Sequence, residues 1–227
     1  MIRIIFENKK LLNEVNMEKV KERFTQNDFL NAFNKGKNTY TYGSGRLDKG
    51  ATDNLKKICP TVRTPDIYVP ALNKAFQDHD MTTVDRQAMF LAQCLHESMG
   101  FKFTREIWGP TTWQLKYEGH VGLGNIHEGD GKLFMGRGLI QLTGRANYQA
   151  FANWIGDQSI MSNPQIVEGT NYAVLSAIFF WTKNKLNVFA DANDIVGCTR
   201  RVNGINMLGL EERTDLYHKA QDVLSID

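Results

Sequence analysis

Apolar residues recur at helical intervals along most of the chain. The clearest case is the segment 84–99, in which residues three and four positions apart share one apolar face. Thr82 and Asp85 make a weak capping box before this segment, and Gly100 is well placed to end it in the left-handed conformation. The face expected to be buried consists of Ala88, Leu91, Ala92 and Leu95. The pattern therefore predicts a helix that begins near Val84 and stops at Gly100.

The same periodicity predicts other helices. We expect them over 68–78, 144–154, 171–183 and 210–224, and a looser one over 17–33. The regular alternation of apolar and polar positions that a large sheet needs is missing. The fold class is therefore expected to be mainly α, with little β-strand.

Other segments lack a sustained period. Residues 34–50 are polar and contain glycine, which is typical of a loop or linker. The first sixteen residues fit poorly with the rest of the chain, so an appendage and a natural start at Met17 both remain open. The segment 108–138 holds eight glycines and no period, and long irregular segments of this kind usually carry function. We divide the chain into an N-terminal appendage and helix of unknown role (1–50) and a main domain (51–227).

Composition narrows the class of protein. With 227 residues, 42% hydrophobic content and a net charge of +2, the chain suits one globular domain rather than a disordered chain or a nucleic-acid binder. No apolar run approaches the roughly 18 residues of a membrane span, and the apolar stretch at 2–6 is too short for a secretory signal. The odd number of cysteines, widely spaced, makes a disulfide scaffold improbable. We therefore expect a protein that is made in the cytoplasm.

Several common catalytic motifs are absent. Gly43-Ser44-Gly45 lacks the spacing of a nucleophile elbow, and Gly129-Asp130-Gly131-Lys132 lacks the glycine and hydroxyl residues of a phosphate loop. His120 and His127 could join a carboxylate around zinc, but no further ligand spacing supports such a site. We expect neither a metal nor another cofactor.

Two carboxylates are better candidates for chemistry. Glu97 falls in the last turn of the helix at 84–99, where apolar neighbours and the negative end of the helix dipole both favour the protonated form that a general acid needs. Glu106 precedes the glycine-rich segment, where a carboxylate can stay ionised as a base. Two carboxyls in unlike surroundings are what glycoside hydrolysis requires. On spacing alone, the alternative remains that Glu97 only ends a helix and Glu106 is a solvated charge.

Five sequence blocks, in order, decide between these alternatives. They are FLAQCLHESMGF (90–101), REIWGPT (105–111), YEGHVGLGN (117–125), GDGKLFMGRGLIQLTGRANY (129–148) and CTRRVNGINMLGLEER (198–213). Together the chain from about Leu55 to Leu224 resembles glycoside hydrolase family 19, the chitinase-like family that includes bacteriophage endolysins. The GPT, YEG, LGN and GDG elements resemble the endolysin branch, and the paired cysteines of secreted plant chitinases are absent.

The resemblance implies a two-lobed, lysozyme/chitinase-like helical domain with a substrate cleft. It implies that Glu97 is the general acid and that Glu106 is the general base, with Glu118 as the alternative base that plant chitinases would suggest. Thr143 matches the hydroxyl residue that helps to hold the attacking water, although it could instead be the N-cap of the next helix. The positions that match substrate contacts are Gln141, Asn147, Asn203, Arg213, Glu118 and Tyr117.

Three aromatic residues are candidates for sugar contacts, and two positions differ from the family pattern. Trp108, Trp113 and Tyr117 lie in the irregular segment and are plausible stacking surfaces for sugar rings, whereas 179–181 is more plausibly core. Phe134 stands where the family often has tyrosine, so a hydroxyl contact to substrate is expected to be lost. Gly204-Ile205 replaces the usual double glycine after Asn203, which puts the sugar contact of Asn203 in doubt.

The function we expect is that of a phage endolysin with muramidase activity on peptidoglycan. By resemblance the reaction is inverting, which requires carboxyls roughly 6.5–9.5 Å apart. We expect a monomer that binds peptidoglycan, has no nucleic-acid partner and no stable membrane insertion, and waits in the host cytoplasm until a separate membrane pore protein releases it to the periplasmic wall. A chitinase, a non-catalytic wall binder of the same fold and, more distantly, a zinc amidase remain as alternatives.

Overall fold

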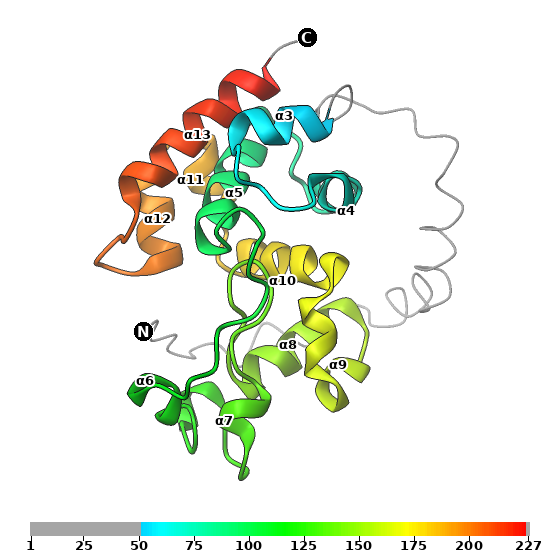
Figure 1. Cartoon of the computed structure of the whole chain (residues 1–227), viewed down its shortest axis with the longest axis vertical. Helices are drawn as coiled ribbons and strands as arrows, with labels where there is room; N and C mark the ends of the chain where they lie inside the picture. Colours follow the sequence, from blue (N-terminus) through cyan, green and yellow to red (C-terminus); the bar gives the residue numbers. More distant parts are fainter. Residues whose placement is uncertain (1–50, 226–227) are drawn as a thin grey trace, which may run out of the picture. The chain divides into compact units, whose positions relative to one another are not determined.

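The computed structural model describes residues 51–225, and within this range the chain is helical (Figure 1). Its α-helices are α3 (Ala51–Ile58), α4 (Pro65–Asp78), α5 (Val84–Glu97), α6 (Thr112–Leu115), α7 (Asp130–Leu133), α8 (Arg145–Ile155), α9 (Ser159–Ser162), α10 (Thr170–Lys183), α11 (Asn187–Asp191), α12 (Ile195–Asn203) and α13 (Leu210–Leu224). Two short 3₁₀ helices, η1 (Val121–Leu123) and η2 (Pro164–Glu168), lie between them. The described range contains isolated β-bridges but no strand, which confirms the mainly α fold class. The expected helix at 17–33 lies outside the described residues.

Helix α5 is the central element of the fold, and it ends at Glu97. Thr83 caps its first turn, because the Thr83 side chain accepts a hydrogen bond from the Arg86 N–H (3.2 Å). The capping box expected from Thr82 was therefore wrong by one residue. Gly100 follows the helix with a φ of +69°, as expected for a residue that ends it.

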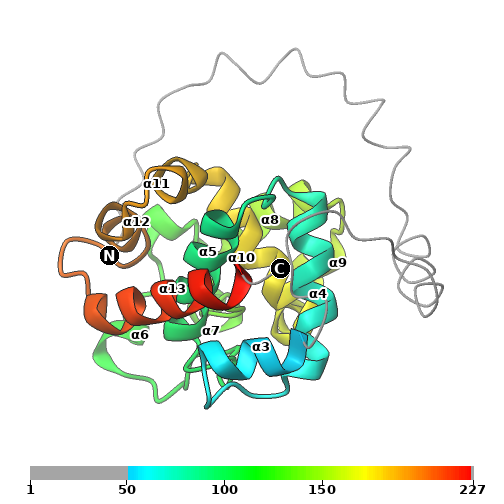
Figure 2. The ribbon, with the colours of Figure 1, turned by 90° about the horizontal axis from the view of Figure 1, so that it is seen from above.

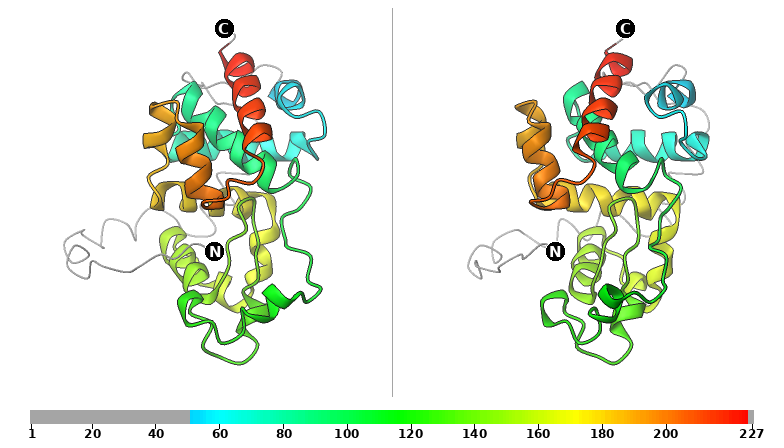
Figure 3. Two further views of the ribbon diagram at one scale, coloured as in Figure 1. Left: turned by 90° about the vertical axis from the view of Figure 1, so that its left-hand side faces the viewer. Right: turned by 60° about the vertical axis from the view of Figure 1, so that its left-hand side comes forward.

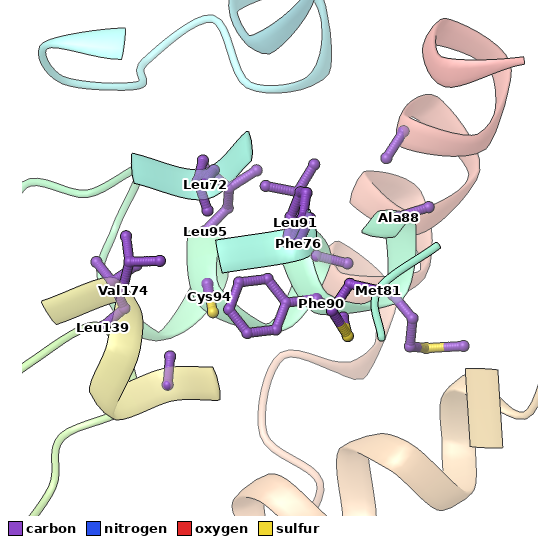
Figure 4. Packing of buried hydrophobic residues seen from close by; sticks show 14 of the residues in the cluster. Leu72, Phe76, Met81, Ala88, Phe90, Leu91, Cys94, Leu95, Leu139 and Val174 are labelled. Atoms are coloured by element: carbon purple, nitrogen blue, oxygen red, sulfur yellow. The ribbon is translucent and has the colours of Figure 1, made fainter. Parts of the chain in front are cut away.

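The first hydrophobic cluster surrounds α5. Residues 87–95 are buried throughout, and Figure 4 shows side chains of α4, α5 and α10 packed together here. Helix α13 packs along α5, α3 packs on α13 and α4, and α12 packs on both α13 and α5. Figure 2 shows α11 and α12 on one side of the α5–α13 pair and α3 and α4 on the other. This packing fixes the end of α5, and Glu97 with it, against α13.

A smaller second cluster lies on the other side of α10. Its buried members are Phe134, Tyr148, Phe151, Ala152, Ile160, Val167 and Phe179. Helix α10 belongs to both clusters, since Phe179 faces the second and Trp181 the first. These two residues are buried, which confirms that 179–181 serves the core. The described residues thus contain two hydrophobic clusters that share α10.

The irregular segment after α5 connects the two regions. Figure 3 shows the chain leaving α5 beside the stretch that precedes α8, and bridges join Arg105 to Arg137 and Arg137 to Leu142. Helices α6 and α7 lie at the end farthest from α3 and α13 (Figures 1 and 3). The expectation that 108–138 is mostly irregular is confirmed, because its helices are only three or four residues long.

Among the described residues, no helix is long and apolar enough to span a membrane.

Candidate active site

Glu97, the predicted acid, is held by a buried arginine. Arg213 has no exposed surface, and its Nη2 donates to Glu97 Oε1 across the contact between α13 and α5. The Glu97 side chain keeps 21% of its surface exposed, so it can still reach solvent or a ligand. A buried guanidinium needs hydrogen-bond acceptors, and Glu97 Oε1 is one of them. The structure thus brings together two residues that the resemblance had matched to one site.

Further hydrogen bonds fix the orientation of Arg213. Its Nη1 donates to Gln93 Oε1 (2.6 Å), and its Nε donates to the Leu208 carbonyl (3.1 Å). Gln93, itself buried, donates onward to Thr199 Oγ1 (3.1 Å). All three nitrogens of the guanidinium are therefore engaged, two of them by side chains of α5 and the third by the backbone just before α13. Such a network holds the Glu97 carboxylate in one place.

Glu106, the predicted base, lies in a different kind of setting. Its Oε1 accepts from the Gly136 N–H (2.5 Å), and its Oε2 accepts from Gln114 Nε2 (3.0 Å). The Glu106 N–H donates back to the Gly136 carbonyl (3.0 Å). Backbone and side chain of Glu106 are thus both tied to the stretch before α8. Hydrogen bonds to both oxygens hold the Glu106 carboxylate in one orientation.

Tyr117 is a further partner of Glu106. Burial raises the pKa of Tyr117, and the nearby Glu106 charge and a hydrogen bond to Glu106 raise it further. The phenol therefore stays protonated and can donate to the carboxylate. A carboxylate offers about four acceptor positions, so three donors leave room for one more, such as a water molecule.

Thr143 and Gln141 meet Glu106 at Gly136. A β-carbon on Gly136 would lie 2.8 Å from Gln141 Oε1 and 3.3 Å from Thr143 Oγ1, so both side chains lie close to this glycine. Thr143 donates to the Gln141 carbonyl (2.8 Å), which leaves its hydroxyl oxygen able to accept. It is not a helix N-cap, because Gly144 takes that position before α8. Thr143 and Glu106 therefore both lie beside Gly136, and the water site between them stays a prediction.

Gln141 has an unusual conformation. Its φ is +54°, which is uncommon for a residue with a β-carbon and is often found at functional sites. Its Oε1 is buried and accepts no hydrogen bond within residues 51–225, while its Nε2 donates to the Gly138 carbonyl (3.1 Å). This oxygen is not accessible in the present conformation, so the contact of Gln141 with substrate stays a prediction.

Glu118, the alternative base, is occupied elsewhere. Its Oε1 accepts from the Gly129 N–H (2.7 Å) and its Oε2 from the Gly131 N–H (2.8 Å). These donors lie at the start of α7, where a carboxylate satisfies amides that the helix leaves unpaired. The geometry gives Glu118 a structural task and leaves Glu106 as the better candidate for the base.

The remaining predicted contacts are distributed around these groups. Asn147 donates to the Thr143 carbonyl (2.8 Å), and Asn203 Oδ1 accepts from the Leu208 N–H (2.7 Å). Asn203 therefore supports the same Leu208 turn that accepts from Arg213. Gly204 has a φ of +93°, so a glycine is needed directly after Asn203.

The aromatic residues singled out from the sequence differ in exposure. Trp113 is 58% exposed, whereas Trp108 and Tyr117 are half-buried with ring centroids 6.4 Å apart. Phe134 is completely buried against Tyr148, so its ring cannot contact substrate. Because this position does not reach the surface, phenylalanine in place of tyrosine does not remove a hydroxyl contact to substrate here.

Sequence reasoning missed the residues that hold the two carboxylates. Gln93 and Gln114 were not singled out, although Gln93 bonds to Arg213 and Gln114 bonds to Glu106. The Thr111-x-x-Gln114 spacing does carry a capping-box signal, and the structure contains that box at the start of α6. In the described part of the chain, no three His, Cys, Asp or Glu side chains are grouped so that they could hold a metal ion.

Comparison with known proteins identifies the family. Residues 66–201 match the family model for chitinase class I of glycoside hydrolase family 19. A glycosyl hydrolase family 19 domain-containing protein of Haemophilus influenzae is 35% identical over 161 residues, which cover 58% of this chain and 76% of the relative.

Solved structures are similar in fold. Chitinase C from Streptomyces griseus superposes with a TM-score of 0.64 at 18% identity, covering 82% of this chain and 95% of that one. A class IV chitinase from Zea mays has a TM-score of 0.55 at 17% identity, covering 80% and 94%. The family match, which covers more than half of the chain, and the relative point to the same family, and the solved structures share its fold. The chain belongs to glycoside hydrolase family 19.

Proposed function

We propose that this protein is an endolysin of the bacteriophage type, a muramidase that hydrolyses β-1,4 bonds of bacterial peptidoglycan. The observation that supports the proposal is that two carboxylates of a family 19 chain are held by different kinds of hydrogen-bond donor. Glu97 is paired with the buried Arg213, and Glu106 is held by Gly136 and Gln114. An inverting glycosidase needs one carboxyl that donates a proton and another that accepts one.

The chemistry depends on these two settings. Glu97, protonated, donates its proton to the glycosidic oxygen as the bond from C1 to that oxygen breaks. Glu106 accepts a proton from a water molecule as the water oxygen forms its bond to C1 on the opposite face. Arg213 is attracted to the carboxylate that Glu97 becomes, so the donated proton leaves a paired charge behind. Thr143 Oγ1 accepts the second hydrogen of the water.

Peptidoglycan is preferred as substrate because the sequence blocks at 105–131 resemble the endolysin branch. The absence of plant-type paired cysteines agrees with this choice, since Cys59, Cys94 and Cys198 are all free and buried. In this proposal the enzyme acts as a monomer, is held in the host cytoplasm and reaches the periplasmic wall through a separate membrane pore protein.

A chitinase acting on N-acetylglucosamine polymers is the second candidate. The favouring observation is that the similar solved structures are chitinases. Chitin and the peptidoglycan backbone share the β-1,4 linkage between N-acetylated sugars. The two substrates differ in the lactyl ether of muramic acid, which only the second polymer carries.

The deciding experiment is to digest purified peptidoglycan and chitin oligomers with the full chain and to identify the new ends. New reducing N-acetylmuramic acid ends, with slow or no turnover of chitin oligomers, are the expected result. Reducing N-acetylglucosamine ends from peptidoglycan would indicate a glucosaminidase, and faster turnover of chitin would indicate the second candidate. A lack of cleavage of both polymers would leave a non-catalytic wall binder.

A further inference from the structure

We propose that Gln114 is a positioning residue for Glu106, which holds the base carboxylate in the orientation that activates water. The inference deepens the proposed function and rests on Glu106 being the base. It is carried by the hydrogen bonds of one buried amide group.

The Gln114 amide is fully used. Its Nε2 donates to Glu106 Oε2 (3.0 Å) and to the Ile107 carbonyl (2.9 Å), and its Oε1 accepts from the Gly109 N–H (3.1 Å) and the Thr111 N–H (2.8 Å). The residue is 6% exposed. With both hydrogens and both lone pairs engaged, the amide has one satisfactory orientation, and that orientation directs an N–H at the carboxylate.

The backbone around Gln114 is fixed as well. Thr111 Oγ1 accepts from the Gln114 N–H (3.3 Å), and together with the side-chain bond this forms the capping box of α6. The chain between Glu106 and α6 is therefore folded around one side chain, which contacts both its ends. Because Gly136 holds one carboxylate oxygen and Gln114 the other, the two donors together fix the rotation of the Glu106 carboxylate about its last bond.

Only an amide of this length meets all four requirements. Glutamate at position 114 would keep the two acceptor contacts, lose both donors and place a like charge beside Glu106. Methionine would keep the approximate shape and lose every polar contact. Both variants fill the space without a donor, and only Gln114→Glu keeps the acceptor contacts with Gly109 and Thr111, so a loss common to both reports the missing donors.

The first test compares steady-state kinetics and pH profiles of Gln114→Glu and Gln114→Met on soluble peptidoglycan fragments. We expect kcat to fall about 10- to 100-fold in both, as for the loss of a hydrogen bond to a charged group, with KM nearly unchanged. In Gln114→Glu the acid limb of the pH–rate profile should also move to higher pH by about one unit or more, because two adjacent carboxyls tend to share a proton. A wild-type profile in both variants would overturn the inference.

Gln87→Met is the matched control. Gln87 is also a buried glutamine (2% exposed) that donates to a backbone carbonyl, that of Met81 (2.8 Å), at the start of α5. It should lose thermal stability without a shift in the acid limb. Circular dichroism and thermal unfolding of all variants show whether each is folded at the assay temperature. A shifted limb in the control would mean that loss of a buried amide, rather than the contact with Glu106, causes the effect.

The second test removes the base and asks whether Gln114 still matters. In a Glu106→Ala background, azide can replace water as the nucleophile: it forms a bond to C1 while Glu97 protonates the departing oxygen, and the product is a glycosyl azide of inverted configuration. If Gln114 acts through Glu106, adding Gln114→Met should leave the azide-rescued rate within about twofold. A further loss of tenfold would show a general structural role and overturn the inference. A wild-type rate for Glu106→Ala alone would instead refute Glu106 as the base. This outcome appears in the single variant, so it is distinguished from a failure of the inference about Gln114.

Discussion

The guanidinium of Arg213 is completely buried and donates to the carboxylate of Glu97, which is partly exposed. The two residues come from α13 and α5, and they join the last helix of the domain to the end of its central helix. The pair therefore has both a structural and an electrostatic consequence: it fixes the end of α5, and it places a permanent positive charge beside the carboxyl that we propose as the acid.

Glu97→Gln should leave the protein folded and remove nearly all activity. The amide can still accept from Arg213 but cannot give a proton to the leaving oxygen, and a positioned acid contributes about 10²–10⁴-fold. Lysis of purified cell walls and turnover of soluble fragments measure the loss. Glu211→Gln, an exposed change in the first turn of α13, is the control and should behave as wild type. More than about a tenth of the wild-type rate in Glu97→Gln would exclude Glu97 as the acid.

The assignment of Glu106 as the base predicts that substitutions at Glu106 and Glu118 reduce activity to different extents. Glu106→Gln should be about as damaging as Glu97→Gln, because no other described group is expected to take the proton of the water. Glu118→Gln should keep most activity and lose a little stability, since an NH2 group, which cannot accept, replaces one of the two oxygens that accept from Gly129 and Gly131. Rates are compared only after circular dichroism shows the same helix content. The opposite order would transfer the role of base to Glu118.

The long helices could be predicted from the sequence because each buries one face. The expected ranges 144–154, 171–183 and 210–224 lie within a residue of α8, α10 and α13 at each end. Helix α4 begins at Pro65, three residues earlier than expected, because proline is favoured in the first turn of a helix. The prediction did not use Pro65 as a start signal. Shorter α3, α11 and α12 offered too few apolar positions for a period to be recognised.

The predicted carboxylates were accessible to sequence reasoning, but their partners were not. A buried arginine such as Arg213 contradicts the rule that charged residues lie outside, and no periodicity relates it to Glu97. Gln114 reaches Glu106 across eight residues of irregular chain, where spacing implies nothing about contact. The resemblance could match Arg213 to a position near the acid, but the contacts of Gln93, Gln114 and Gly136 required the structure.

The ion pair between Asp130 and Arg145 predicts a pH-dependent stability. Asp130 is 1% exposed, and the hydrogen bonds from Arg145, helped by the His127 N–H, hold its pKa below the ordinary value. A depressed pKa stabilises the fold above the pKa of the unfolded chain, about 3.9, and this stabilisation is lost as the pH falls through the folded-state value. Asp130→Asn should therefore cost about 1.5–3 kcal/mol at pH 7, and the difference should shrink below about pH 4.

Urea unfolding at several pH values measures that difference. Asp191→Asn is the matched control, because Asp191 also makes two bonds to one arginine, Arg86 (2.6 Å each), but its side chain is 44% exposed. An exposed pair should contribute about 1 kcal/mol or less. Equal losses in the two variants would contradict the argument from burial.

Thr143→Val tests the proposed water site. Valine keeps the shape of the side chain and removes the hydroxyl that lies near Gly136, while Glu106 keeps its donors. Loss of one neutral hydrogen bond to the water, about 0.5–1.5 kcal/mol, corresponds to a rate that is about 2- to 15-fold lower. Thr143→Ser, which keeps the hydroxyl, should restore most of the rate. A loss as large as that of Glu106→Gln would mean that Thr143 does more than hold a water molecule.

The stereochemistry of the product tests the roles of Glu97 and Glu106 together. If Glu106 activates a water molecule on the face opposite the leaving group, C1 is inverted in a single displacement, and a β-linked substrate gives the α anomer first. Proton NMR of a fresh digest of soluble fragments, recorded before mutarotation, distinguishes the anomers directly. A β anomer formed first would require a covalent glycosyl-enzyme intermediate, with one carboxylate attacking C1 itself. Glu106 would then be a nucleophile, and Thr143→Val would no longer be expected to slow the first step.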